Sequence, residues 1–300
     1  MYAITGATGN TGGVIAEKLL AQGEKVRVIG RDPGHLARLV QKGAEAFVTD
    51  ITDPRALTKA FTGAEAVYVM IPPNIATPDV AAYQERISDT AAQAIEKAGV
   101  ERAVLLSSIG ADKAAGTGPI TGLHNFEQKL NGLTGLNALY VRAGYFMENL
   151  LPQIAVIKSM GIMAGPVRPD LRLPMIATRD IGASAAEALR KNDFRGKQTR
   201  EIQGQRDVAY SEAAALIGKS IGKSDLTYAQ MPPSQLRPAL LQMGMSSNMA
   251  DLLLEMAKAL NSGHVAALER RSAANTTPTP IERFVAEEFV VRFNGQAAGV

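Results

Sequence analysis

The 300-residue chain contains no cysteine and no tryptophan, and only 5% of its residues are aromatic. Without cysteine there can be no disulfide, no thiolate metal site and no cysteine nucleophile, which fits a reducing compartment. The three histidines are scattered and do not have the spacing of metal ligands, so we expect no metal. So few aromatic residues also argue against a stacking surface for single-stranded nucleic acid.

Long apolar runs and a one-signed charge pattern are also missing. The most apolar region, residues 144–167, is interrupted by Glu148, Pro152 and Lys158, which makes it a poor membrane span. The first residues lack the basic and apolar regions of a signal peptide. The net charge is +3, and acids and bases are interspersed rather than grouped into a basic stripe. We therefore expect a cytoplasmic protein that binds neither membranes nor nucleic acid directly.

Short β-branched runs alternate with longer helical patterns through the first half of the chain. Nearly continuous apolar strands separated by amphipathic helices predict a parallel sheet covered on both faces. Gly23, Gly43, Gly63 and Gly99 each close a helical run as a left-handed cap would, and Asp53 precedes Pro54 as a helix N-cap. The predicted strands are residues 2–5, 25–30, 44–49, 64–71, 101–108 and 136–144. Six such units match the α/β doubly wound, Rossmann-type fold.

A glycine-rich loop follows the first predicted strand. Gly6, Gly9 and Gly12 are spaced so that the chain can turn, approach a ligand with bare backbone and pack a helix closely. A diphosphate would then lie at the helix amino end, where free N–H groups and the helix dipole favour an anion. The side chains that could add donors are Thr8, Asn10 and Thr11. The alternative is a plain tight turn, but the position between strand and helix favours a dinucleotide.

The end of the second strand bears on which dinucleotide is bound. Arg31 comes first after the strand, where a guanidinium could pair with the 2′-phosphate of NADP(H). Asp32, which could hold the ribose of NAD(H), is followed by proline and is better placed to cap the next helix. NADP(H) is therefore preferred to NAD(H), although Arg31 could be a solvated loop charge. Asp50 could accept from the adenine amino group or serve as an ordinary turn residue.

The tyrosine and lysine pair of short-chain reductases is missing. None of the seven tyrosines has a lysine four residues later. On the helix after strand five, His124 stands roughly where the tyrosine would be and Gln128 where the lysine would be, while Lys129 points to another face. His124 could donate a proton or be a structural hydrogen-bonding residue. Glu127 could orient His124 or pair with a basic residue, but a solvated helix charge is the favoured interpretation.

The segments GATGNTGG, DITDP, SSIGA, LHNFEQKL and VRAGYFMENL together resemble the NmrA-like group of atypical short-chain dehydrogenases/reductases. That group includes NADPH-dependent quinone, triphenylmethane-dye and azo reductases, and also regulators that bind the dinucleotide without turnover. The resemblance implies cofactor contacts at Ser107, Ser108, Tyr145 and Phe146, with Phe146 and Asn149 also at the substrate. Tyr145 joins His124 as a candidate catalytic residue, and Ile71 and Pro72 complete the predicted cofactor contacts.

We expect residues 1–150 to form the NAD(P)-binding domain and residues 151–300 a smaller α+β lobe on the substrate side, interleaved with the sheet. Residues 151–176 read as irregular structure. The remaining predicted elements are helices at 178–193, 211–223, 233–268 and 279–289 and strands at 199–204 and 225–231. The leading function is hydride transfer from NADPH to a quinone, an azo or triphenylmethane dye or a related carbonyl. The alternative is a redox sensor with a regulatory protein partner, and a homodimer stays open.

Overall fold

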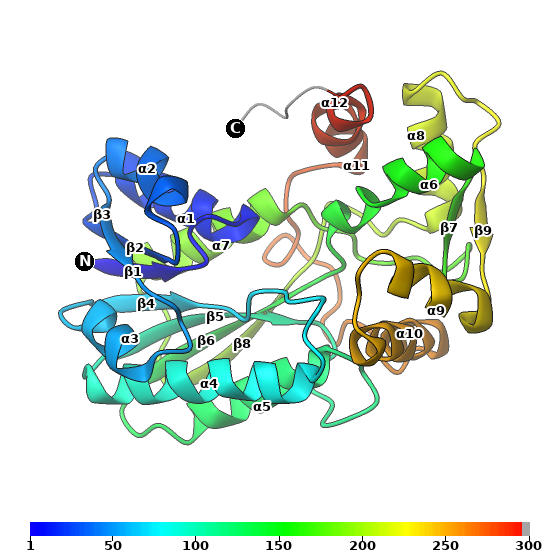
Figure 1. The fold of residues 1–300 in the computed structure, drawn as a ribbon. Helices are drawn as coiled ribbons and strands as arrows, with labels where there is room; N and C mark the ends of the chain where they lie inside the picture. Colours follow the sequence, from blue (N-terminus) through cyan, green and yellow to red (C-terminus); the bar gives the residue numbers. More distant parts are fainter. Residues whose placement is uncertain (296–300) are drawn as a thin grey trace.

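A seven-stranded sheet forms the centre of the fold in the computed structural model, which describes residues 1–295 (Figure 1). Neighbouring strands are all parallel and follow the order β3-β2-β1-β4-β5-β6-β8. The strands are β1 (Tyr2–Thr5), β2 (Val26–Gly30), β3 (Glu45–Val48), β4 (Ala66–Val69), β5 (Arg102–Ser108), β6 (Asn137–Ala143) and β8 (Lys197–Ile202). The predicted doubly wound parallel sheet is confirmed, and β8 from the second half extends it.

Helices cover both faces of this sheet, because its inner strands are apolar on both sides. One face carries α1 (Asn10–Ala21), α2 (Pro33–Gln41) and α7 (Thr178–Lys191), and the other carries α3 (Pro54–Phe61), α4 (Val80–Lys97) and α5 (Ile120–Asn131) (Figure 1). Ile15 and Ile181 belong to the apolar cluster on the first face. Phe61 and Phe126 belong to the cluster on the second. The inner strands β1, β4 and β5 are therefore buried between two helical layers, whereas β3 at the border is largely exposed.

The predicted helix start at Asp53 and the helix ends marked by four glycines are confirmed. The Asp53 carboxylate accepts hydrogen bonds from the amides of Arg55 and Ala56, with Pro54 at the first helical position. All four predicted capping glycines have left-handed backbone: φ is 79° at Gly23, 99° at Gly43, 77° at Gly63 and 65° at Gly99. Each helix thus ends where glycine removes the Cβ penalty of that conformation.

The second half adds a second parallel sheet and several helices around it. Its elements are the 3-10 helix η1 (Met147–Leu150), α6 (Gln153–Met160), β7 (Met163–Gly165), α8 (Tyr210–Ser220), β9 (Tyr228–Gln230), α9 (Pro233–Gln242), α10 (Ser247–Ser262), α11 (Ile281–Phe284), the π-helical turn Val285–Phe289 and α12 (Val290–Phe293). The strands β7 and β9 pair in parallel. The expectation of irregular structure over residues 151–176 is wrong, because this segment holds α6 and β7, with Gly161 closing α6 in the left-handed conformation.

The segment 265–279 runs from the end of α10 back to the carboxyl end of β8. The Glu201 carboxylate on β8 accepts hydrogen bonds from the amides of Leu268 and Glu269, at 2.8 and 2.9 Å. Gln203 then exchanges backbone hydrogen bonds with Asn275 and Thr277, at 2.7 and 2.9 Å. This returning segment therefore covers the end of the last strand of the sheet.

Candidate functional site

The loop between β1 and α1 is built on backbone contacts that glycine alone permits. Gly6 has φ of +62°, in the left-handed region, and a Cβ there would lie 2.9 Å from Met70 Sδ. A Cβ on Gly12 would lie 2.3 Å from the carbonyl oxygen of Gly6. Gly9 has extended backbone, and its Cβ would lie 3.3 Å from the same oxygen. Gly6 and Gly12 therefore fix the path of the loop, and Gly9 leaves its outer surface bare.

The amino end of α1 offers backbone donors to an anion. Gly9 is its N-cap, no side chain caps the helix, and the first turn has no acidic residue. The first N–H groups of a helix have no partner inside it and, with the helix dipole, favour a negative charge. Thr8, Gly9 and Asn10 are exposed here. Thr11 is buried with Oγ1 2.9 Å from the Tyr68 hydroxyl, so its backbone amide alone remains for a ligand. A diphosphate fits this bare, uncapped cradle.

The turn after β2 separates the two charged candidates for the ribose. Asp32 caps α2, because its carboxylate accepts a 2.7 Å hydrogen bond from the amide of Gly34. Arg31 is exposed. Hydrogen bonds from Thr52 lower the pKa of Asp50, and the charge of Arg31 lowers it further. The predicted capping role of Asp32 is confirmed, and the Arg31 guanidinium stands near Asp50 at the strand ends.

The loop after β4 adjoins the same corner. Ile71 and Pro72 are half-buried there, and the Pro72 carbonyl accepts a 3.0 Å hydrogen bond from the Tyr83 hydroxyl of α4. Burial raises the pKa of Tyr83, while the nearby charges of Arg31 and Asp50 act on it in opposite directions. The ends of β2, β3 and β4 thus bring Arg31, Asp50, Ile71 and Pro72 into one neighbourhood.

A buried ion pair lies beneath the end of β5. Glu127 on α5 is 2% exposed and forms a two-pronged contact with Arg142 on β6, at 2.9 and 2.6 Å. The Ser107 hydroxyl donates to the same carboxylate at 2.6 Å. The interpretation of Glu127 as a solvated helix charge is therefore wrong, because it pairs with a basic residue. The Ser107 hydroxyl is engaged in this contact, whereas the half-buried Ser108 donates to the Ile109 carbonyl at 2.9 Å.

His124 lies on α5, half-buried, with Nδ1 2.9 Å from the carbonyl oxygen of Ala111. A carbonyl oxygen can only accept, so Nδ1 carries a proton and Nε2 is the ring nitrogen left for another partner. The ring is thus oriented by the loop after β5 rather than by Glu127. Lys129 faces α4, where it pairs with Asp89. Both alternatives for His124, proton transfer and a structural hydrogen bond, stay open.

Tyr145 follows β6 and is held firmly by backbone contacts. Its amide donates to the Pro174 carbonyl at 3.1 Å, and its carbonyl accepts from Ile176 at 2.8 Å. Its hydroxyl lies 2.8 Å from that of Tyr210 on α8. Burial raises the pKa of Tyr145, and hydrogen bonds from Tyr210 and Asn149 oppose this shift. Phe146 is half-buried and Asn149 exposed, so Tyr145, Phe146 and Asn149 stand together at the sheet edge.

The predicted site residues share one edge because the sheet is parallel. The ends of β1, β2, β4, β5 and β6 lie on the same side, where ligands of such sheets bind. The glycine loop, Arg31 and Tyr145 each follow one of these strands, and Ser108 is the last residue of β5. Their roles toward a cofactor stay predictions.

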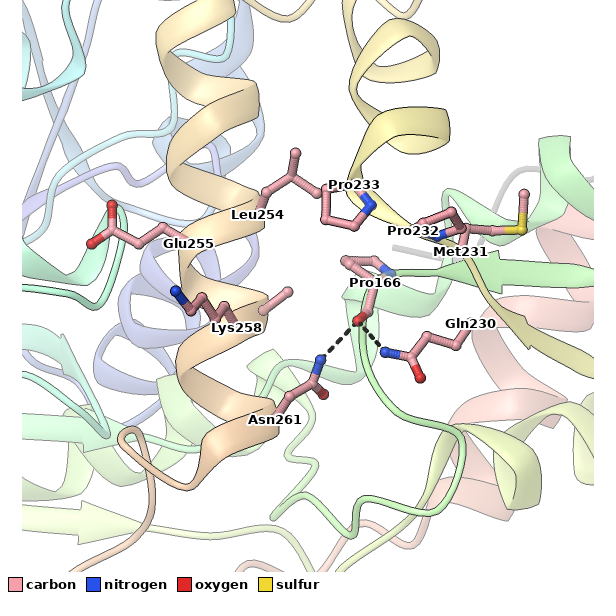
Figure 2. A pocket seen from close by; sticks show the side chains of 10 residues that line it. Pro166, Gln230, Met231, Pro232, Pro233, Leu254, Glu255, Lys258 and Asn261 are labelled. Carbon is pink, nitrogen blue, oxygen red and sulfur yellow. Dashed lines mark hydrogen bonds between the residues drawn. The ribbon is translucent and has the colours of Figure 1, made fainter.

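A groove of about 710 Å³ lies elsewhere, at the carboxyl ends of β7 and β9 (Figure 2). Pro166 follows β7, and its carbonyl accepts hydrogen bonds from the side chains of Gln230 and Asn261, at 3.3 and 2.9 Å. The residues of α10 that line the groove include Leu254, Lys258 and Asn261. Elsewhere on this helix, Leu252 packs against Gly118, where a Cβ would lie 2.1 Å from the Leu252 carbonyl oxygen. The groove therefore contains none of the predicted cofactor residues.

Two further features concern membranes and metals. Within residues 1–295, no helix combines the length and the apolar character needed to cross a membrane. Across the same residues, His, Asp and Glu side chains nowhere gather in threes that could hold a metal ion.

The family follows from the sequence as a whole. The NmrA-like family model matches residues 2–289. This chain belongs to the NmrA-like family. It is 26% identical over 258 residues to NAD(P)H azoreductase of Xenophilus azovorans, covering 85% of this chain and 86% of that protein. It is 28% identical over 260 residues to quinone oxidoreductase 2 of Escherichia coli, covering 85% and 86%. The predicted family is confirmed.

Solved structures share the fold of this NmrA-like chain. The E. coli NADPH-dependent quinone oxidoreductase QOR2 complexed with NADPH has a TM-score of 0.76 at 22% identity, covering 100% of this chain and 96% of that one. NmrA, a negative transcriptional regulator solved in complex with NADP, has a TM-score of 0.67 at 17% identity, covering 98% and 96%. One fold thus occurs in both an oxidoreductase and a regulator.

Sequence reasoning missed two partnerships in this NmrA-like site. Tyr210 was not among the predicted site residues, although its hydroxyl meets Tyr145 across 65 positions of sequence. Arg142 was also missed, although it pairs with Glu127. Arg142 reaches Glu127 because β6 lies between β5 and β8 in the sheet. No local sequence pattern indicates this contact or the one between Tyr145 and Tyr210.

Proposed function

We propose that this chain is an NADPH-dependent oxidoreductase that transfers a hydride to a small conjugated acceptor. Quinones lead, with azo dyes, triphenylmethane dyes and related carbonyls behind them. The observation that carries the proposal is the cradle at the amino end of α1, where a Cβ on Gly12 would strike Gly6 and no side chain caps the helix. The names of the azoreductase and quinone oxidoreductase relatives support the type of chemistry.

The preference for NADPH over NADH rests on the turn after β2. Asp32 is engaged with the Gly34 amide as a helix cap, whereas Arg31 is exposed and can pair with a 2′-phosphate. Asp50, beside Arg31, is available to the adenine amino group. Fluorescence titration with both coenzymes checks this assignment, since NADPH should bind at least about tenfold more tightly if the guanidinium pairs with the phosphate. Tighter binding of NADH would contradict it.

Bound NADPH would supply a hydride. The chain's own residues would orient the coenzyme and the acceptor and provide a proton to the acceptor. In the proposed complex the α1 loop would hold the diphosphate and Ser108 would border the nicotinamide half. Ile71 and Pro72 would contact the coenzyme on the side of Arg31 and Asp50. Phe146 and Asn149 form the mouth for the acceptor. The Tyr145 phenol keeps its proton at neutral pH, because burial raises its pKa. His124, with Nδ1–H engaged, presents Nε2 as an acceptor unless it is protonated.

The cradle can be tested by a matched pair of substitutions. Gly12→Ala forces the loop away from the α1 amides, so the Kd for NADPH should rise roughly 100-fold, the loss of one or two charge-assisted hydrogen bonds. Gly13→Ala is the control, since its Cβ would lie 3.3 Å from the Ala7 carbonyl and requires only a small shift. Equal NADPH affinity in both variants would refute the placement of the diphosphate.

Turnover separates the enzyme from the alternative, a dinucleotide-binding redox sensor. Absorbance of NADPH should fall when wild-type protein is mixed with a panel of quinones, azo dyes and triphenylmethane dyes. Clear coenzyme binding without turnover of any acceptor would favour the sensor. NmrA, a negative transcriptional regulator solved in complex with NADP, shares this fold. A cytoplasmic location, a homodimer or regulatory partner, and a functional boundary at residue 150 stay predictions.

A further inference from the structure

Three tyrosines connect the second half of the chain to the end of β6. The rings of Tyr210 and Tyr228 stack at 4.6 Å between centroids, and Tyr210 meets Tyr145 edge-on at 6.1 Å and 75°. The Tyr228 hydroxyl donates to the Val167 carbonyl at 2.9 Å rather than to either of the other two tyrosines. The Tyr210 ring is thus held between two others, and its hydroxyl faces that of Tyr145.

The direction of the hydrogen bond between Tyr145 and Tyr210 follows from burial. Tyr210 is 5% exposed, and within residues 1–295 its hydroxyl bonds to Tyr145 alone. A buried hydroxyl must donate its proton to an acceptor, or it bears the cost of an unsatisfied donor. If Tyr145 donated, the Tyr210 proton would be left among apolar side chains. Tyr210 therefore donates, and the proton of the half-buried Tyr145 is left to point elsewhere.

We propose that Tyr210 is a positioning residue that aims the Tyr145 proton at the acceptor and stabilises the phenolate left behind. This inference rests on the proposed reductase function. In the step, the Tyr145 O–H bond breaks and a new O–H or N–H bond forms on the acceptor. With the hydride from NADPH, the acceptor gains two electrons and two hydrogens, and the phenolate later regains a proton from water.

The arrangement gives this chain a substitute for the absent tyrosine and lysine pair. In that pair the lysine charge favours the tyrosinate. Here a hydroxyl and the Asn149 side chain act on the Tyr145 oxygen. Donors aimed at a developing negative charge, in a site that excludes water, stabilise the transition state more than the ground state. Tyr210 never touches the acceptor, so its effect should appear in kcat rather than in KM.

The kinetic test compares Tyr210→Phe with Tyr228→Phe. Tyr210→Phe keeps the stacked ring and should lower kcat roughly 10- to 100-fold with the quinone KM within about twofold. Tyr228→Phe, whose hydroxyl lies on the far side of Tyr210, should leave kcat unchanged. The Tyr145→Phe/Tyr210→Phe double variant should be no slower than Tyr145→Phe, because both act through one proton. Additive losses, or a Tyr210→Phe enzyme at wild-type rate, would overturn the proposal.

A titration of the protein without coenzyme supplies a readout independent of turnover. Uniform 3-fluorotyrosine lowers the phenol pKa values, and ¹⁹F NMR follows each ring, with Tyr145 identified by its loss in Tyr145→Phe. Tyr210→Phe should raise the pKa of Tyr145, and Tyr228→Phe should not. An unmoved Tyr145 titration would refute the donated hydrogen bond. If wild-type protein turned over no acceptor while the titration moved, the bond would stand but the positioning role and the reductase function would both be rejected.

Discussion

Glu201 on β8 is a buried acidic residue whose side chain contacts the returning segment, residues 265–279. It is 1% exposed, and one carboxylate oxygen accepts from the amides of Leu268 and Glu269 while the other is buried without a partner. Burial raises its pKa above 4.5, with the charge of Glu269 adding to the shift and Arg142 opposing it. Folding therefore favours the protonated form of the Glu201 carboxyl over the charged form.

The pH dependence of stability should report this residue. Because the folded pKa is raised, the stability it contributes is complete below about pH 4.5, the unfolded value, and is lost as pH rises through the folded value. Glu201→Gln keeps an oxygen for both amides and cannot ionise, so its Tm relative to wild type should rise between pH 4.5 and pH 8. Glu201→Ala loses both bonds and should be destabilised by about 1–3 kcal/mol throughout. A constant Tm difference for Glu201→Gln would contradict this account.

At the residue scale, sequence reasoning succeeded where local geometry decides. The glycine loop and the capping role of Asp32 depend on residues a few positions apart, so spacing predicts them. The contacts of Tyr210 with Tyr145 and of Glu127 with Arg142 depend on which elements the tertiary fold brings together. From the sequence alone, a glutamate next to the buried Phe126 is predicted to be solvent-exposed. Only the tertiary structure shows that Arg142 on β6 faces it.

Helix α5 is tied to β5 and β6 by that buried pair. Ser107 comes from β5, Glu127 from α5 and Arg142 from β6. The Glu127 carboxylate is buried and the Arg142 guanidinium is half-buried, so their contact links the three elements. Removing one charge from a buried pair leaves the other uncompensated, which costs about 3–5 kcal/mol, whereas apolar replacement of both can be nearly neutral.

A double-mutant cycle tests this link between α5 and the sheet. Glu127→Leu should lower the free energy of unfolding in urea by about 3–5 kcal/mol. Glu127→Leu/Arg142→Met should lose clearly less, because no unpaired charge remains. Losses that simply add would show that the two side chains do not act as a pair.

Elements with a strong period were predicted, and short ones among glycines and methionines were not. The strands of the first half and α7, α8 and α10 follow from apolar runs and helical spacing. The segment 151–176 hides α6 and β7 because β7 spans three residues and pairs with the distant β9. A strand this short is stabilised by pairing with β9, and no local pattern in residues 151–176 reveals that pairing, although a strand over β9 itself was predicted.

The whole molecule is closed by elements from beyond residue 150. Helix α7 packs on α1 so tightly that a Cβ on Gly182 would lie 2.8 Å from the Thr11 carbonyl. Strand β8 pairs with β6 over six positions, from Lys197 to Ile202. Ile4, Ile181 and Ile202 belong to one apolar cluster. The first 150 residues alone would therefore expose one face of α1 and the edge of β6.

Truncation should show this dependence. The fragment 1–150 should aggregate or lack a cooperative melt, whereas the full chain should unfold in a single calorimetric transition that coincides with its far- and near-ultraviolet circular dichroism. A monomeric fragment that melts cooperatively and binds NADPH would show that the predicted domain stands alone.

The returning segment, residues 265–279, also limits how far the edge strand β8 is open to pairing with a strand of another molecule. It occupies the carboxyl end of the last strand, while Lys197 and Arg200 place positive charge along the rest. At the opposite border, β3 spans four residues and sets the Glu45 carboxylate against Arg27. Short, charged or covered borders are poor templates for a foreign strand. Concentrated samples should accordingly resist the strand-to-strand aggregation to which open parallel sheets are prone.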